Sequence, residues 1–155
     1  MSKSRAIYVS FGRGYLLLTM QTPTPRTHYD QLGGANGVQR LVNRFYDLMD
    51  ASPEARNVRA LHATSLKQSR GKLIMFLTGW TGGPPLYVEQ VGPPMLRRRH
   101  LPFAISPRES GEWLWCMDRA LDEQEMPAEL RELLRQKFHE LGAHMVNRVK
   151  GVAGE

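Results

Sequence analysis

The segment RRRHLPFAI, residues 97–105, raises the question on which the interpretation of this sequence depends. It places one histidine, His100, between three arginines and a run of apolar residues. A solvated basic turn and a histidine of the core are the ordinary explanations of such a pattern. The rest of the sequence must decide whether this imidazole has a further role.

The composition is that of one ordinary globular domain. The chain has 155 residues, of which 41% are hydrophobic and 23% charged. Its 21 Lys and Arg against 15 Asp and Glu give a net charge of +6, which raises nucleic-acid binding as an alternative. That alternative predicts DNA affinity that falls steeply with salt. The positive charge is scattered, however, and only Arg97–Arg99 form a run, so we expect no nucleic-acid partner.

The single cysteine, Cys116, excludes an intramolecular disulfide and a zinc site built on cysteines. A reducing, cytoplasmic setting is the simplest expectation. Residues 1–27 are expected to form a flexible extension that ends in the Pro-rich TPTPRT, and Met20 is an alternative start. Their apolar stretch is interrupted by Arg13 and is too short to span a membrane, so no membrane partner is expected. Residues 28–150 are predicted to form the domain, and 151–155 a tail.

From Tyr29 onward, apolar residues recur at spacings of three and four, which predicts an all-α fold. The second of these helices ends at GGPP, residues 82–85, where glycine permits left-handed geometry and proline stops the helix. Another begins at SPRE, residues 106–109, which has the pattern of a capping box. A last helix starts at Pro127. Residues 86–105 are predicted to be irregular.

The usual enzyme motifs G-x-x-x-x-G-K-[ST], G-x-S-x-G and H-E-x-x-H are not present in the sequence. His139 and His144 are five residues apart, which does not place them on one helix face as a pair of metal ligands. Two aromatic residues with polar tips, Tyr46 and Trp113, fall on apolar helix faces. Each needs a hydrogen-bond partner if it is buried.

Five segments together are similar to the group II truncated haemoglobins: YDQLGG (29–34), RFYDLM (44–49), FLTGWTGGPPLY (76–87), RRRHLPFAI (97–105) and EWLWCM (112–117). They follow the order and spacing of that family from about Tyr29 to Asn147. The resemblance implies a globin-like, two-over-two helical sandwich around haem b.

The resemblance also implies roles for individual residues. His100 corresponds to the proximal histidine, the axial iron ligand, and Tyr46, Trp113 and His62 face the ligand on the distal side. Ser69 stands where ordinary globins have a distal histidine. Further contacts with the haem are implied for Phe45, Leu61, Ser69, Lys72, Leu73, Phe76, Leu77, Tyr87, Met95, Arg97, Arg99, Phe103, Ile105 and Met117.

These roles answer the question raised by the segment 97–105. Haem is a flat apolar ring with two carboxylates at one edge, so it needs an apolar cradle with a positive rim. Leu101, Phe103 and Ile105 are expected to pack on the ring, while Arg97, Arg99 or Lys72 meets the propionates and Arg98 faces solvent. His100 leaves the opposite axial site open for O2, CO or NO.

Oxygen binding or carriage is the first expectation for the function. An enzyme that oxidises nitric oxide or performs peroxidase-like chemistry is the alternative, and its turnover would require an external reductase. The assembly is expected to be a monomer or a weak homodimer. Gly92-Pro93-Pro94 departs from the Gly-His-Pro that the family commonly has before the basic run, and we expect this to alter the loop without affecting iron ligation.

Overall fold

The computed structural model describes residues 6–11, 14–19 and 26–149. All the secondary structure within residues 26–149 is helical. The longer helices are α2 (Gly34–Ala51), α4 (Lys67–Trp80), α7 (Pro107–Glu123) and α8 (Ala128–Met145). The shorter ones are α1 (His28–Leu32), α3 (Arg56–Ala60, directly after the 3-10 turn Pro53–Ala55), α5 (Leu86–Gln90) and α6 (Leu96–His100).

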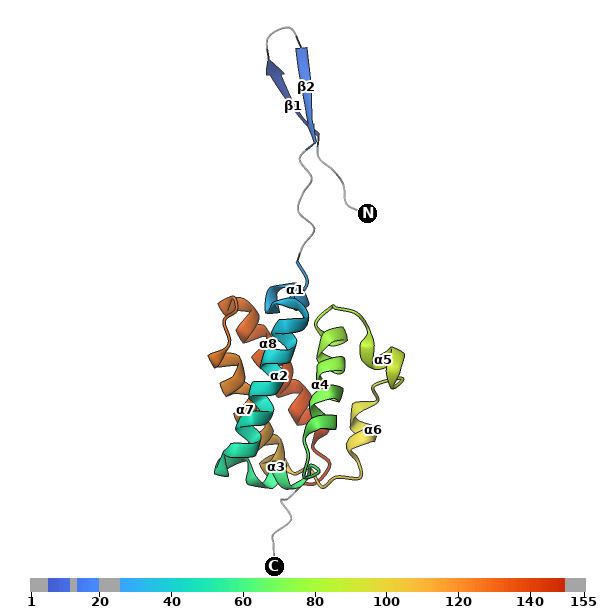
Figure 1. The fold of residues 1–155 in the computed structure, drawn as a ribbon, viewed down its shortest axis with the longest axis vertical. Coiled ribbons are helices and arrows are strands. Elements are labelled where there is room, and N and C mark those ends of the chain that lie inside the picture. Colours follow the sequence, from blue (N-terminus) through green and yellow to red (C-terminus); the bar gives the residue numbers. More distant parts are fainter. Residues whose placement is uncertain (1–5, 12–13, 20–25, 150–155) are drawn as a thin grey trace, which may run out of the picture.

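The four longer helices form two pairs, α2 with α4 and α7 with α8, and the pairs pack on each other (Figure 1). Helix α2 lies against α7. Helix α4 reaches α8 through Trp80 and Phe138, whose ring centroids are 4.9 Å apart. The all-α, two-over-two arrangement predicted from the sequence is therefore confirmed.

The core lies between these pairs. Helix α2 buries one whole side, because its apolar residues recur every three or four positions. Phe45 and Val42 on α2, Leu77 on α4 and Met117 on α7 are fully buried. Burial of one such side chain stabilises the folded state by roughly 1.5–3 kcal/mol. The core thus fixes the distance between the helices that carry the candidate site.

The ends of two helices follow the predicted local chemistry. Ser106 and Glu109 form the capping box at the start of α7, and Pro107 occupies its first turn. After α4, Gly82 has a φ of 101°, which favours glycine. Gly83 lies so close to Tyr29 that an added Cβ would be 2.8 Å from the Tyr29 ring. The GGPP segment therefore ends α4 and also packs closely against α1.

Residues 86–105 differ from the irregular segment predicted for them, because they include the helices α5 and α6. Each has only five residues, too few to produce a recognisable helical period in the sequence. This correction concerns the segment that carries His100, so the candidate proximal residue lies at the end of a helix and not in a loop.

Within the predicted extension, residues 6–11 and 14–19 form two strands. Strands β1 (Ala6–Phe11) and β2 (Gly14–Thr19) pair in antiparallel register, from Ala6 opposite Thr19 to Phe11 opposite Gly14. Two apolar runs separated by two residues, one of them glycine, are a typical hairpin pattern. The boundaries 1–27 and 28–150 stay a prediction, and the tail 151–155 lies outside the described residues. Among the helices described, none combines the length and the apolar character that crossing a membrane requires.

Candidate functional site

His100 is the last residue of α6 and is half-buried. Its Nδ1 lies 2.6 Å from the main-chain oxygen of Leu96, one turn earlier. A carbonyl oxygen can only accept, so Nδ1 carries the hydrogen and donates it, and Nε2 keeps its lone pair. A hydrogen bond at one ring nitrogen that leaves the other available is the usual arrangement of a histidine that binds a metal. The geometry therefore suits the axial-ligand role predicted for His100.

The surface beside His100 is apolar and poorly covered by other side chains. Met95, Leu101 and Phe103 are 50%, 48% and 43% exposed, respectively, whereas Ile105 is buried. Met95 has a left-handed backbone conformation, with a φ of 41°, and this turns the chain into α6 directly after Pro94. A cluster of exposed apolar side chains is typical of a surface that another apolar group covers. These residues fit the flat ring of a haem.

Tyr46 lies on α2 with its ring buried. Its ring centroid is 4.8 Å from that of Phe45, and the Arg70 guanidinium carbon is 5.7 Å from the Tyr46 centroid. Burial raises the pKa of Tyr46 to about 12, against the smaller opposing effects of the Ser69 hydroxyl and the Arg70 charge. The phenol is therefore protonated at neutral pH and can donate a hydrogen bond.

Trp113 is held on α7 between two aromatic residues of other helices. Its ring centroid is 4.9 Å from Phe45 on α2 and 5.8 Å from Phe138 on α8. Phe45 also contacts Tyr46, so one phenylalanine separates the two predicted distal donors. The structure thus brings Tyr46 and Trp113 into one aromatic cluster, although 67 positions separate them in the sequence.

His62 follows α3 and is half-buried, with its ring centroid 5.9 Å from that of Tyr46. Its Nδ1 lies 2.8 Å from the Val58 main-chain oxygen and must donate to it, so Nε2 of the neutral ring is an acceptor. Burial lowers the pKa of His62, and the charges of Arg59 and His100 lower it further, against the effect of the Val58 bond. The neutral form therefore predominates at pH 7, and its Nε2 can accept a hydrogen bond.

The three predicted cationic contacts, Arg97, Arg99 and Lys72, differ in their surroundings, and Arg98 was expected to face solvent. Arg97 Nη1 donates to the main-chain oxygens of His144 and Val146, at 2.7 and 2.8 Å. Arg99 Nη2 donates to Pro93 O at 3.2 Å, and its guanidinium lies over the Tyr87 ring. Arg98 and Lys72 are exposed. Within residues 26–149, none of these four forms an ion pair with a carboxylate.

The remaining predicted contacts come from the helices around these residues. Phe45, Leu77 and Met117 belong to the fully buried core, and Tyr87 on α5 is nearly so. Half-buried positions are Leu61 after α3 and Ser69, Leu73 and Phe76 on α4. Phe76 continues the aromatic cluster, because its centroid lies 6.1 Å from both Trp80 and Tyr87.

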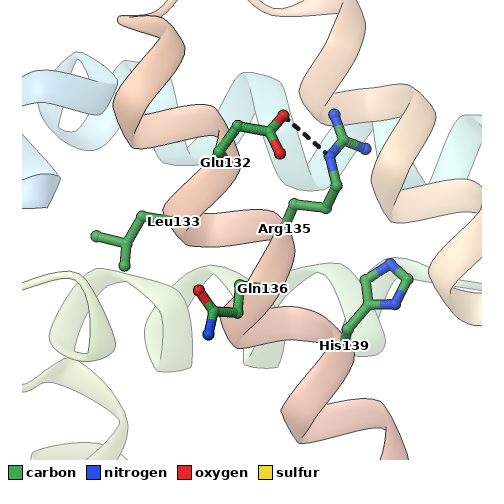
Figure 2. Close-up of a pocket in the computed structure, with 5 residues that line it drawn as sticks. All are labelled: Glu132, Leu133, Arg135, Gln136 and His139. Carbon is green, nitrogen blue, oxygen red and sulfur yellow. Dashed lines mark hydrogen bonds and ion pairs between the residues drawn. The ribbon is translucent and has the colours of Figure 1, made fainter.

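The surface has one hollow away from the predicted site residues and another that is lined in part by His62. Figure 2 shows the first, on the outer side of α8, where Arg135 pairs with Glu132 at 3.4 Å beside His139. It holds none of the predicted site residues. The second is lined by residues between Met49 and Thr64, among them His62. His62 therefore lies between this hollow and Tyr46.

Two residues that sequence reasoning missed hold the distal side together. The Glu112 carboxylate, next to Trp113, accepts from the main-chain N–H of Asn57 and Val58 and so anchors α3 on α7. Arg70 on α4 donates to Asn43 O and to Asp47 Oδ1 on α2, at 2.9 and 2.7 Å. Both act across long sequence separations, which no local motif reveals.

Comparison with known proteins identifies relatives of this chain. The family model described as bacterial-like globin matches residues 27–147. The group 2 truncated hemoglobin YjbI of Bacillus subtilis (strain 168) is 37% identical over 117 residues, which cover 76% of this chain and 86% of that protein. The structure of the group II 2-on-2 hemoglobin from Agrobacterium tumefaciens superimposes with a TM-score of 0.78 at 47% identity and covers 83% of this chain and 98% of its own. The cold-adapted truncated hemoglobin of Pseudoalteromonas haloplanktis TAC125 gives the same TM-score at 41% identity, with 79% and 99% covered.

Proposed function

This chain belongs to the group II truncated haemoglobins, and from that premise we propose that it holds haem b and binds O2, CO and NO at an open axial site. Haem-based ligand binding is what membership of this family implies. Oxygen as the main ligand, and its carriage as the use of that binding, are the finer parts of the proposal.

The observation that carries the proposal is the hydrogen bond from His100 Nδ1 to Leu96 O. It fixes the tautomer and directs the lone pair of Nε2 away from α6. When bound, haem supplies an iron atom that takes one nitrogen ligand from the protein and a diatomic gas on the opposite face. Leu101 and Phe103 offer apolar surface to the ring beside that nitrogen.

On the distal side, the hydrogen-bond donors are the phenol of Tyr46 and the indole N–H of Trp113. The Tyr46 phenol is protonated because it is buried, and the indole N–H of Trp113 has no acidic form in the physiological range. A hydrogen bond to an acceptor that carries partial negative charge contributes roughly 1.5–3 kcal/mol. Two such donors slow the release of bound oxygen more than the release of bound CO, because CO acquires less negative charge.

The two carboxylates of the haem would pair with the cationic side chains Arg97, Arg99 or Lys72. Arg99 and Lys72 are exposed and pair with no carboxylate in the described part of the chain. Arg97 uses Nη1 for the end of α8, so only its other nitrogens are available to a propionate. Arg99 likewise uses Nη2 for Pro93 O, so each arginine would meet a propionate with its remaining nitrogens, and Lys72 with its ammonium group.

A second candidate function is peroxidase-like or nitric-oxide dioxygenase chemistry with an external reductase, favoured by one observation. His62 lines a surface hollow and its ring lies near Tyr46, so it can carry a proton between solvent and the distal side. We propose a cytoplasmic protein, monomeric or weakly dimeric, for either function.

The visible spectrum tests the proposal directly. The protein is loaded with haemin, reduced with dithionite and exposed to CO. We expect a haem Soret band that shifts sharply on CO addition, as an open axial site requires. A protein that takes up no haemin, or a reduced spectrum that CO does not change, would refute it. Rapid mixing of the oxygenated form with NO then separates carriage from dioxygenase turnover.

A further inference from the structure

We propose that Asn147, at the end of α8, is a positioning residue for His100 that sets the orientation of the proximal imidazole and thereby the strength of its bond to iron. The inference rests on the proposed function, because it presupposes that His100 is the iron ligand. It adds a residue outside the predicted haem contacts.

Asn147 binds the turn that follows the proximal helix at several points. Its Nδ2 donates to the main-chain oxygens of His100 and Phe103, at 3.1 and 2.9 Å. Its Oδ1 accepts from the Ile105 N–H at 3.0 Å. Its own main-chain N–H donates to Ile105 O at 2.9 Å. One side-chain amide therefore fixes both the start and the end of the turn 100–105.

Helix α6 depends on such polar contacts because it has little packing of its own. It has five residues, and none of them is buried. Within the structure as described, its principal partner is α8. Arg97 holds the first turn of α6 by donating to His144 O and Val146 O, and Asn147 holds its last residue. The end of α8 therefore holds α6 at two places, three residues apart.

The His100 carbonyl is the point at which this contact affects the imidazole. At a helix end, the last carbonyl oxygens lack their usual partners. His100 O accepts from Phe103 N–H at 3.0 Å and from Asn147 Nδ2. Loss of the Asn147 side-chain amide leaves His100 O with only the bond from Phe103 N–H and frees α6 to rotate about its axis. Because the imidazole is fixed to α6 through Leu96 O, such rotation moves Nε2.

The test uses the full-length, haem-loaded ferrous protein without gas. Asn147→Ala removes all the side-chain bonds, and Asn147→Asp keeps the size and the acceptor oxygen but loses both Nδ2 donations. Gln136→Ala, on the exposed outer side of α8, is the matched control. Resonance Raman spectroscopy measures the iron–histidine stretching band, haem transfer to apomyoglobin measures the rate of haem loss, and thermal unfolding measures stability.

We expect both Asn147 variants to shift and broaden the iron–histidine band, and Gln136→Ala to leave it unchanged. Haem loss should accelerate roughly tenfold or more, a factor that corresponds to about 1.4 kcal/mol. Should Asn147→Ala fail to fold, Asn147→Asp still decides the matter.

An unchanged iron–histidine band in a folded Asn147 variant would overturn the role of Asn147. If the unfolding temperature is lowered while the band is unchanged, Asn147 is merely structural. A wild-type protein without any iron–histidine band would instead refute the proposed function itself. The failure of the two ideas is thus distinguishable.

Discussion

Tyr46 and His62 are neighbours whose burial gives them opposite hydrogen-bonding roles. Burial raises the pKa of the Tyr46 phenol to about 12, so its O–H is retained and can donate. Burial also lowers the pKa of His62, so the ring is neutral, and its bond to Val58 O makes Nε2 an acceptor. At neutral pH the donors proposed toward a bound gas are therefore Tyr46 and Trp113.

Replacement of Tyr46 by phenylalanine tests the first donor. Tyr46→Phe keeps the ring and its contact with Phe45 but removes the hydroxyl. We expect oxygen to dissociate about tenfold to a hundredfold faster, the equivalent of a lost bond of roughly 1.5–3 kcal/mol. Stopped-flow displacement of oxygen by CO measures the rate, and the half-buried Tyr29→Phe is the control. A rate within twofold of the parent would remove Tyr46 from the account.

Trp113→Phe tests the second donor. It removes the indole N–H and retains an aromatic ring between Phe45 and Phe138. We expect faster oxygen release, by about tenfold or more, with little change in CO release because CO is the weaker acceptor. The two dissociation rates are measured on the same preparation. Equal acceleration of both gases would point to lost packing and not to a lost hydrogen bond.

The residues that carry the chemistry could be predicted from the sequence, but those that hold them could not. His100, Tyr46 and Trp113 stand in short motifs, and the structure brings Tyr46 and Trp113 into one aromatic cluster with Phe45. Glu112 opens the segment EWLWCM and Asn147 ends the matched region, but neither position indicates its bonding role, because their partners lie 55 and 47 positions away. Such contacts exist only once the helices have packed.

At the scale of helices, α7 shows how local chemistry fixes an element. Burial opposes ionisation of Glu109, but hydrogen bonds from Ser106 and Arg108 outweigh it and lower the pKa of the carboxyl to about 2. Its ordinary value is 4.5, so the folded state binds this proton more weakly than the unfolded chain. The capping box therefore stabilises the protein fully above about pH 4.5, and this contribution is lost as the pH falls toward 2.

Glu109→Gln tests this linkage. We expect a loss of roughly 2 kcal/mol in the free energy of unfolding at pH 7, which shrinks as the pH is lowered from 4.5 toward 2. Urea unfolding followed by circular dichroism measures the difference between variant and parent at each pH. The exposed Glu125→Gln is the control. A difference that stays constant from pH 7 to pH 3 would contradict the origin given for it.

Helix α4 offers a second test, of ligand access. Ser69 is a small, half-buried residue close to the Tyr46 phenol. Ser69→Trp fills the space between α4 and the distal side, so we expect CO to bind at least several-fold more slowly. Flash photolysis measures this rate. Gln68→Trp, an equally large change at the exposed neighbouring position, should bind CO at the parent rate. An unchanged rate in Ser69→Trp would show that ligands take another route.

The short elements mark the limit of prediction from the sequence. The long helices show several turns of apolar periodicity, and α7 also shows its cap, so they could be predicted. Helices α5 and α6 have five residues each, and the pairing of β1 with β2 depends on a connection of two residues. Five residues span little more than one helical turn, too few for a recognisable period, whereas the hairpin does show a typical pattern of two apolar runs joined by two residues.

At the scale of the whole molecule, the two pairs of helices meet through a chain of aromatic side chains. Phe45, Trp113, Phe138 and Trp80 link α2, α7, α8 and α4 in that order through adjacent ring contacts. Helix α6 stands outside this chain and is tied to the end of α8 by polar bonds. The distal residues are thus held by the core, and the proximal histidine by the C-terminal end of α8.

The central claim is that His100 binds the iron, and a replacement by glycine tests it most directly. The ferrous, gas-free His100→Gly protein is examined by resonance Raman spectroscopy before and after the addition of imidazole. We expect the iron–histidine band of the parent to be absent from the variant and added imidazole to restore an iron–imidazole band. An iron–histidine band that persists in His100→Gly would show that another residue is the ligand and would contradict the account.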